Sequence, residues 1–210
     1  MLKKTPYFWT ISMVLLAALF ISGCQTQNST AHKGTAAAAT PAESASAANT
    51  NVIPTLTLSG GAYRVKAGRN TPYTDGRGRV WQADTGFTGG DVSERDAGTK
   101  IVGSRDPEMF LTEHYGMDSF ACHIPNGNYT VNLYFAETYD GINGPGDRVF
   151  SFNVQGHEFR DFDVWIKAGG PYRPYVLPVT VTVTNGIFKI DFTTQNDNPE
   201  INAIEIVPTQ

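Results

Sequence analysis

The sequence predicts an all-β domain, built as a β-sandwich or jelly roll. Apolar and polar residues alternate with a period of two in several short segments, as at Val149–Val154, which is typical of half-buried strands. Glycine-rich turns separate these segments, as between Asp140 and Asp147. No 3.6-residue period persists over ten positions in this part of the chain, so we expect no long helix there.

The clearest pair of strands spans residues 179–192. Val179–Thr184 and Ile187–Phe192 both alternate, and an Asn-Gly pair separates them at positions 185–186. Asn-Gly favours positive φ at both positions and therefore predicts a two-residue type I′ hairpin. In that register Val183 faces Phe188, and the large apolar side chains of both strands share one face.

The same alternation predicts further strands at 117–124, 129–136, 149–154 and 201–207. Pro107–Thr112, with Asp106 as its N-cap, favours a helical turn. Trp81 belongs to a strand-like segment and is expected in the core. Cys122 lies in another such segment and is expected to be a small, buried apolar residue.

The N-terminus has the pattern of a targeting segment at residues 1–23. Lys3 and Lys4 precede the mostly apolar Tyr7–Ile21, whose 15 residues are fewer than the about 20 that a membrane-spanning helix needs. The Ile-Ser-Gly-Cys sequence that ends at Cys24 resembles the bacterial lipobox. The resemblance implies cleavage before Cys24 and attachment of lipid, palmitate included, to make a lipoprotein. The alternative is an ordinary signal peptide followed by an incidental cysteine.

Composition divides the rest of the chain into two parts. Residues 24–58 are rich in small and polar residues and cannot bury enough apolar surface to fold, so we expect a flexible tether. Residues 59–210 form one domain, long enough to bury roughly 70% of its unfolded surface. With Cys24 lipidated, Cys122 has no partner, and no disulfide is expected.

The net charge of the chain and the residue after Cys24 indicate its partners and its cellular location. Removal of residues 1–23 leaves 14 basic and 20 acidic residues, a net charge of −6. This argues against nucleic acid, for which a basic patch is the expected footprint. Gln25, where aspartate would favour the inner membrane, favours the outer membrane. We therefore expect a lipid-anchored protein of the cell envelope, facing the periplasm or the surface.

The sequence gives little support to catalysis. No nucleophile elbow, zinc-binding His-Glu-x-x-His or phosphate-binding loop is present, and the four histidines lack ligand spacing. We therefore expect no catalytic residues, no metal and no cofactor. A glycoside hydrolase, which needs two carboxylates about 5–10 Å apart, stays as a minor alternative. Its candidate carboxylates are Glu113, Glu137, Asp140, Asp147 and Asp197.

Aromatic residues in predicted loops favour a binding function. Sugars present apolar C–H faces that pack on aromatic rings, and hydroxyls that bond to carboxylate or amide oxygens. Phe87, Tyr115 and Tyr139 all lie in or beside glycine-rich loops, and Asp197 lies in a polar turn. As a set, these residues are typical of a carbohydrate site.

These segments resemble the malectin domain family over most of Tyr63–Val207. The stretches that carry the resemblance, in order, are Tyr73–Asp75, Val80–Phe87, Asp106–Pro107, Thr112–Gly116, Tyr134–Tyr139, Arg148–Phe150, Phe162–Val164, Ala168–Gly170 and Asp197–Ile201. The resemblance implies a jelly-roll-like β-sandwich, akin to galactose-binding domains, that binds glucose-containing oligosaccharides. Bacterial relatives are often appended to glycoside hydrolases as carbohydrate-binding modules.

The resemblance also implies which residues contact the sugar. By position they are Phe87, Tyr115, Tyr139, Asp140 and Asp197. Two of them differ in type from malectin, because Phe87 stands where malectin has tyrosine and Asp140 where it has phenylalanine. At Asp140 a stacking platform is replaced by a hydrogen-bond acceptor, which implies a different glycan or none.

We therefore expect non-catalytic carbohydrate binding by a membrane-anchored lipoprotein, with a gluco-oligosaccharide or related glycan as ligand. The alternative is a protein-interaction or envelope-assembly module that has lost its sugar site, with an envelope protein as partner.

Overall fold

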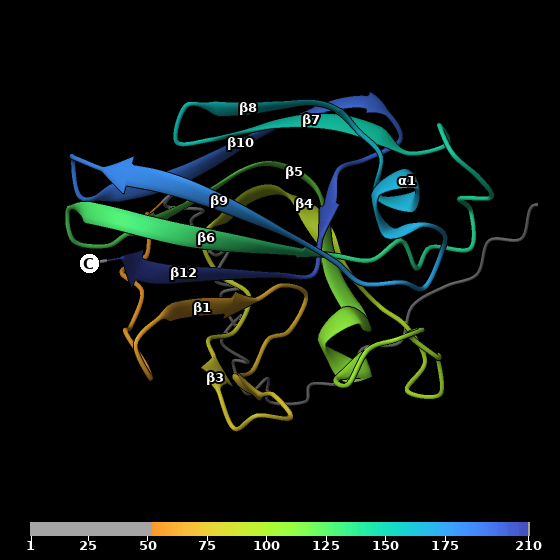
Figure 1. The fold of residues 1–210 in the computed structure, drawn as a ribbon, viewed down its shortest axis with the longest axis horizontal. Helices are drawn as coiled ribbons and strands as arrows, with labels where there is room; N and C mark the ends of the chain where they lie inside the picture. Colours follow the sequence, from red (N-terminus) through yellow and green to blue (C-terminus); the bar gives the residue numbers. More distant parts are fainter. Residues whose placement is uncertain (1–51, 210) are drawn as a thin grey trace, which may run out of the picture. The chain divides into compact units, whose positions relative to one another are not determined.

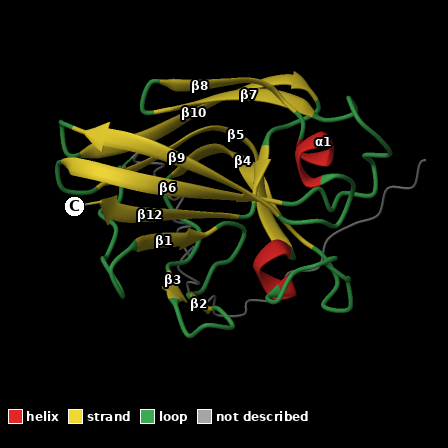
Figure 2. Ribbon diagram, in the orientation of Figure 1, coloured by secondary structure: helices red, strands yellow, loops and turns green. Residues whose placement is uncertain are grey.

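The computed structural model describes residues 52–209, whose strands form two facing antiparallel sheets (Figure 1; coloured by secondary structure in Figure 2). The first sheet has the order β1 (Tyr63–Lys66), β12 (Ala203–Thr209), β6 (Gly127–Phe135) and β9 (Tyr175–Val183). The second has the order β11 (Glu200–Ile201), β5 (Thr112–His123), β10 (Ile187–Asn196), β7 (Val149–Val154) and β8 (His157–Phe162). In addition, β4 (Phe87–Glu94) pairs with β5. The predicted all-β sandwich is confirmed.

The remaining elements are short. The strands β2 (Tyr73–Thr74) and β3 (Val80–Trp81) pair with each other, and the 3₁₀ helix η1 (Pro107–Phe110) lies where a helical turn was predicted. The helix α1 (Val164–Ala168) is capped by Asp163, whose side chain accepts a hydrogen bond from the backbone N–H of Ile166 at 3.0 Å. Within residues 52–209, no helix is long and apolar enough to cross a membrane.

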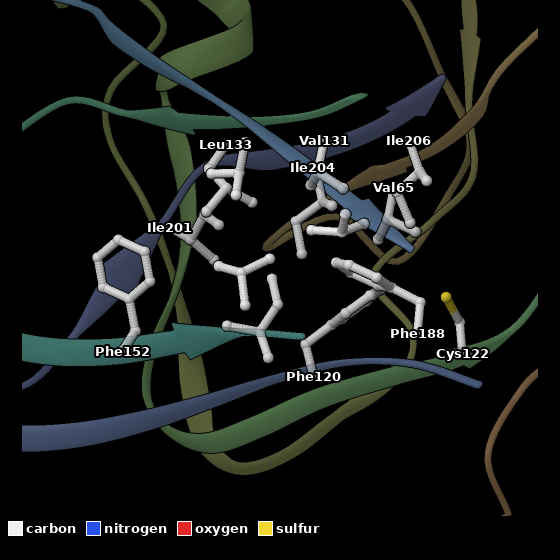
Figure 3. Close-up of a cluster of buried hydrophobic side chains, with 14 of the residues drawn as sticks. Val65, Phe120, Cys122, Val131, Leu133, Phe152, Phe188, Ile201, Ile204 and Ile206 are labelled. Carbon is white, nitrogen blue, oxygen red and sulfur yellow. The ribbon is translucent and has the colours of Figure 1, made fainter. Parts of the chain in front are cut away.

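The core fills the space between the two sheets, as Figure 3 shows. Alternate residues of the strands point inward, so Leu133 of β6 and Ile204 of β12 face Phe120 of β5 and Phe188 of β10. All four side chains are at most 1% exposed. Burying such a side chain contributes roughly 1.5–3 kcal/mol to folding, so this alternation is the main reason why the two sheets pack together.

One strand pairing differs from the prediction. β9 pairs with β6 in the first sheet, whereas β10 pairs with β5 and β7 in the second. Val183 and Phe188 are both buried in the core, as expected, but they lie on opposite sheets. The predicted type I′ hairpin is therefore wrong, and positive φ is adopted at Gly186 (74°) but not at Asn185.

A neighbouring turn explains why the Asn-Gly pair connects the sheets instead of closing a hairpin. The backbone N–H of Gly186 donates to Oδ1 of Asn126 at 2.7 Å, and the N–H of Ile124 donates to the carbonyl of Gly186 at 3.1 Å. Asn126 lies between β5 and β6, which also belong to different sheets. The connection from β5 to β6 and the connection from β9 to β10 both pass from one sheet to the other, and these hydrogen bonds hold them together.

Two single-residue expectations are confirmed. Trp81 is fully buried in a second, smaller apolar cluster, and its Nε1–H donates to Asp75 at 3.0 Å. Cys122 is fully buried in the main core as a free thiol. Burial raises the pKa of this thiol to about 12, which keeps it in the unreactive protonated form.

The predicted targeting segment, Cys24 and most of the predicted tether lie outside the described residues. Residues 52–58, the last part of the predicted tether, lie along the sandwich. Leu56 is buried in the main core, and its backbone N–H donates to the carbonyl of His123 at 3.3 Å. The packed domain therefore includes residues before β1.

Candidate functional site

A cavity of about 340 Å³ lies where β5, the loop after β6 and the turn before β11 meet. It lies at the same end of the sandwich as α1, because the segment after α1 bonds to the loop after β6 through Tyr172 and Glu137 (2.8 Å). The cavity is lined by Ser93, Arg95, Glu113, Tyr115, Tyr139, Arg148, Asp197 and Asn198.

Tyr139 forms one wall of this cavity and is 48% exposed. Its backbone N–H donates to Oε1 of Glu137 at 3.0 Å, and the guanidinium of Arg95 lies 5.8 Å from the centroid of its ring. The ring also lies against Gly141, where an added Cβ would come within 2.4 Å of Cε1 of Tyr139. The exposed ring is thus held in place by its surroundings.

Asp197 and Asn198 also line the cavity, in the turn between β10 and β11. Asp197 adopts a left-handed backbone conformation with φ of 57°, which is unusual for a residue other than glycine. The guanidinium of Arg148 stabilises this turn, because its Nη1 donates to the carbonyl of Asn198 at 2.5 Å and lies 3.7 Å from the carboxylate of Asp197.

Two ion pairs contribute to the lining of the cavity. Arg148, 4% exposed in its side chain, donates from Nε to Oε2 of Glu137 at 2.7 Å, and Arg95 donates to Glu113 at 2.7 Å. Glu137 thus binds Arg148 with one oxygen and the backbone of Tyr139 with the other. The buried Glu137–Arg148 ion pair therefore connects the loop of Tyr139 to the turn of Asn198.

A third carboxyl group, that of Glu200, lies beside these pairs. It is fully buried, and neither of its oxygens has a hydrogen-bond partner within residues 52–209. Burial raises the pKa of Glu200 well above its usual value, and the negative charges of Glu113 and Glu137 add to this, while Arg148 and Arg95 oppose it. Glu200 is therefore protonated in the folded protein at pH values where it is ionised in the unfolded chain.

This protonation predicts a pH dependence of stability. The folded state holds the Glu200 proton to higher pH than the unfolded state, so the contribution of Glu200 to the free energy of unfolding falls as pH rises above about 4.5. The loss is about 1.4 kcal/mol per pH unit until the folded-state pKa is reached. We expect Glu200→Gln, which cannot ionise, to be more stable than wild type by a margin that grows with pH. Denaturant unfolding from pH 4 to 8 tests this, and a margin independent of pH would contradict it.

The structure brings together three of the five sequence-predicted site residues, Tyr115, Tyr139 and Asp197. Asp140 is adjacent to Tyr139 in the chain but is not among the lining residues, and its carboxylate accepts a hydrogen bond from the hydroxyl of Tyr172. Phe87 lies elsewhere. Its half-buried ring stacks on His114 at 4.2 Å between centroids and contacts the main core.

Sequence reasoning missed the arginines of the cavity, Arg95 and Arg148. Their role depends on acids that are distant in the chain or buried, so spacing alone carries no signal for it. Glu113 and Glu137, considered as hydrolase carboxylates, are held in ion pairs by these arginines.

Comparison with known proteins identifies the family. The family model described as Malectin domain matches residues 62–204, most of the chain. The chain belongs to the malectin domain family. Receptor-like protein 4 of Arabidopsis thaliana is 38% identical over 84 residues, which are 39% of this chain and 13% of that protein. The chain spans between 7% and 18% of the length of the curated relatives that it matches.

Solved structures share the fold of this malectin domain. The β-glucuronidase of Bacteroides uniformis superposes with a TM-score of 0.63 at 18% identity, over 71% of this chain and 18% of that chain. A chain from the crystal structure of the plant peptide RALF23 in complex with FER and LLG2 superposes with a TM-score of 0.62 at 17% identity, over 78% of this chain and 54% of that chain. At these identities the similarity concerns the fold alone.

Proposed function

We propose that this malectin domain binds a carbohydrate, without catalysis, in the cavity between Tyr115, Tyr139 and Asp197. One observation carries the proposal. These three residues come from β5, the loop after β6 and the turn before β11, yet they line one cavity. Their types are those that saccharide binding needs, because aromatic rings pack on C–H faces and a carboxylate accepts hydrogen bonds from hydroxyls.

The dimensions and polarity of the cavity support this ligand class. A volume of about 340 Å³ lies at the small end of the roughly 300–1,000 Å³ range of small-molecule sites. Ser93 and Asn198 add a hydroxyl and an amide to the lining. Because Arg95 and Arg148 are already paired with acids, the cavity offers hydrogen bonds without a large net charge, which suits a neutral sugar.

The same ion pairs support binding over hydrolysis. A glycosidase needs one carboxyl group free to donate a proton and a second free to attack or to activate water. Glu113 and Glu137, in contrast, each accept a close contact from an arginine. We therefore assign both acids to the positioning of the cavity walls.

We further propose that the protein is a bacterial lipoprotein, anchored through lipid on Cys24 and held away from the membrane by the tether that follows. The lipobox-like sequence before Cys24 supports the anchor, and Gln25 supports the outer membrane. In this arrangement the domain holds an envelope or external glycan near the membrane.

Titration calorimetry with glucose-containing oligosaccharides tests the sugar site. We expect a dissociation constant between about 1 μM and 1 mM for wild type. Tyr139→Ala, which removes one wall, should weaken binding about tenfold or more, because it loses an aromatic stacking surface. Tyr115→Ala should act in the same direction.

Phe87→Leu is the matched control, because Phe87 was assigned to the sugar site by resemblance but packs against His114 outside the cavity. It should bind like wild type. Equal, weak heats for wild type, Tyr115→Ala and Tyr139→Ala would contradict the proposal.

A protein-interaction or envelope-assembly module is the second candidate. It is supported by the structural similarity to a chain solved in complex with a plant peptide, and by Asp140, which replaces the aromatic residue of malectin. Binding of one purified envelope protein, together with a flat response to all glycans, would favour this alternative.

A further inference from the structure

A second cavity, of about 560 Å³, lies between the turn that connects β2 to β3 and the loop before η1. It shares no lining residue with the candidate sugar site. We call it the arginine groove, and its lining residues include Arg77, Arg79, Arg105, Tyr134 and Val176. The proposed binding of a carbohydrate therefore gives this groove no role.

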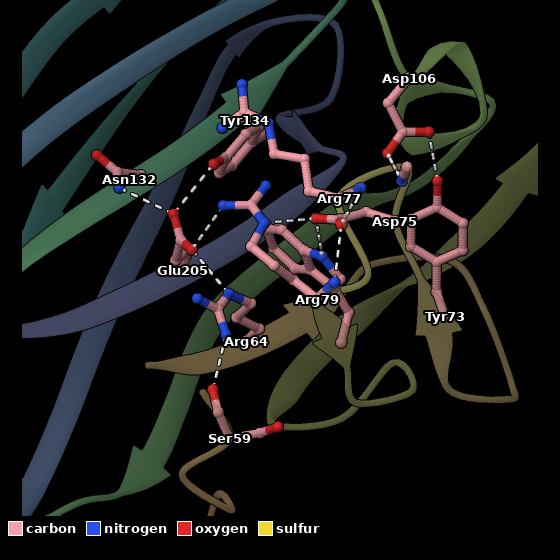
Figure 4. Close-up of polar contacts among 12 residues, drawn as sticks. Ser59, Arg64, Tyr73, Asp75, Arg77, Arg79, Asp106, Asn132, Tyr134 and Glu205 are labelled. Carbon is pink, nitrogen blue, oxygen red and sulfur yellow. Dashed lines mark hydrogen bonds and ion pairs between the residues drawn. The ribbon is translucent and has the colours of Figure 1, made fainter. Parts of the chain in front are cut away.

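The first acid of the arginine groove, Asp75, is fully engaged within its own turn (Figure 4). Its carboxylate accepts hydrogen bonds from the backbone N–H groups of Arg77 and Arg79 at 2.9 Å each. It also accepts from Nε of Arg79 at 2.6 Å and from the indole N–H of Trp81 at 3.0 Å. These bonds lower the pKa of Asp75 to about 2, against the opposing effect of burial. These bonds hold the backbone of the turn that carries Arg77 in place.

The second acid, Asp106, joins the two walls of the groove. It accepts a hydrogen bond from the hydroxyl of Tyr73 at 2.5 Å and another from the backbone N–H of Gly76 at 3.1 Å. The loop that carries Arg105 is thus tied to the turn that carries Arg77. The backbone positions of the two arginines are therefore set by the fold.

A third carboxylate, Glu205, is buried behind the groove. Its Oε1 pairs with Arg64 at 2.7 Å and with Arg79 at 3.1 Å, while its Oε2 accepts from Asn132 and Tyr134. Arg79, with 29% of its side chain exposed, therefore has its charge largely compensated.

Arg77 and Arg105 have no such compensation. Both are exposed, and neither has an ion pair with an acid among residues 52–209. Figure 4 shows the side chain of Arg77 directed toward Tyr134, on the side of the groove. The three nearby carboxylates are occupied by other donors, so two of the residues that line the groove, Arg77 and Arg105, carry positive charges without an acid partner.

We propose that the arginine groove binds the oxyanion group of an acidic ligand, such as a carboxylate, sulfate or phosphate. Guanidinium groups bind such oxyanions through paired, charge-assisted hydrogen bonds. Arg77 and Arg105 contact the anion, whereas Arg79 stays paired with Asp75 and Glu205. The partly exposed Val176 (39%) and the ring of Tyr134 supply apolar surface for the body of the ligand.

Titration followed by NMR of the arginine Nε–H signals tests this inference. The probes are sulfate, inorganic phosphate, glucuronate and, as the neutral arm, glucose, all at constant ionic strength. We expect the signals of Arg77 and Arg105 to shift and saturate with at least one anion and not with glucose. Saturation by glucuronate alone assigns the site to a carboxylate on an organic ring, whereas saturation by all three anions assigns it to the oxyanion itself.

A pair of double variants separates a specific site from general electrostatic attraction. Arg77→Gln with Arg105→Gln should weaken anion binding about tenfold or more. Arg160→Gln with Lys167→Gln removes the same charge at exposed positions outside the groove and should leave affinity unchanged. Equal losses in both double variants, or shifts that never saturate with any anion, would overturn the proposal. Neither outcome depends on whether the candidate sugar site binds saccharide.

Discussion

Arg148→Met is expected to destabilise the domain by about 3–5 kcal/mol, because it leaves the carboxylate of Glu137 buried and unpaired. Glu137 is 1% exposed in its side chain, so water cannot replace the lost guanidinium. The variant should also lose saccharide binding. Without Arg148, the turn at Asp197 and Asn198 loses a hydrogen bond and an ion pair.

Chemical unfolding and calorimetric titration measure the two effects. Arg160→Met is the control, because Arg160 forms its ion pair with Glu158 at the surface, where such pairs contribute little. Adding Glu137→Gln to Arg148→Met should recover part of the stability, since the buried, unpaired carboxylate of Glu137 is removed. If Arg148→Met proves as stable as Arg160→Met, the buried pair does not support the cavity.

Gly90→Ala is expected to destabilise the domain by about 2–5 kcal/mol. Gly90 lies in β4 with φ of 78°, and a Cβ there would come within 2.3 Å of the carbonyl oxygen of Tyr115 and 2.7 Å of the backbone N of Met117. A left-handed conformation costs a residue with a Cβ about 1–2 kcal/mol, and crowding adds about 1–3 kcal/mol. Because both neighbours are backbone atoms, β4 must move away from β5 beside the sugar site.

Gly78→Ala is a matched control for this variant. Gly78 has the same φ of 78°, but an added Cβ would meet no atom within 4 Å. The difference in unfolding free energy between the two variants isolates the contact with β5. Equal destabilisation by Gly78→Ala and Gly90→Ala would show that the close approach of β4 to β5 contributes nothing.

The fold class followed from the sequence, because a period of two identifies which side chains are buried. Val149–Val154 forms β7 within the predicted bounds, and Val183 and Phe188 are buried as expected. Alternation does not identify the partner strand, however. In a sandwich, two successive strands on facing sheets bury their side chains in the same core, so the pattern is the same as for a hairpin.

Only some residues of the candidate site could be predicted from the sequence. Tyr115, Tyr139 and Asp197 are placed together by the fold, and the family resemblance had suggested them as a set. Phe87 lies elsewhere because its ring has a stacking partner in His114, which no spacing rule reveals. The ion pair between Glu137 and Arg148 depends on burial, which only the folded structure defines.

The central claim is that a saccharide binds in the cavity lined by Tyr115, Tyr139 and Asp197. Intermolecular NOEs between a bound glucose-containing oligosaccharide and assigned ring protons measure this directly. We predict NOEs from the sugar C–H protons to the rings of Tyr115 and Tyr139. NOEs confined to side chains outside the cavity, at saturating ligand, would contradict the account.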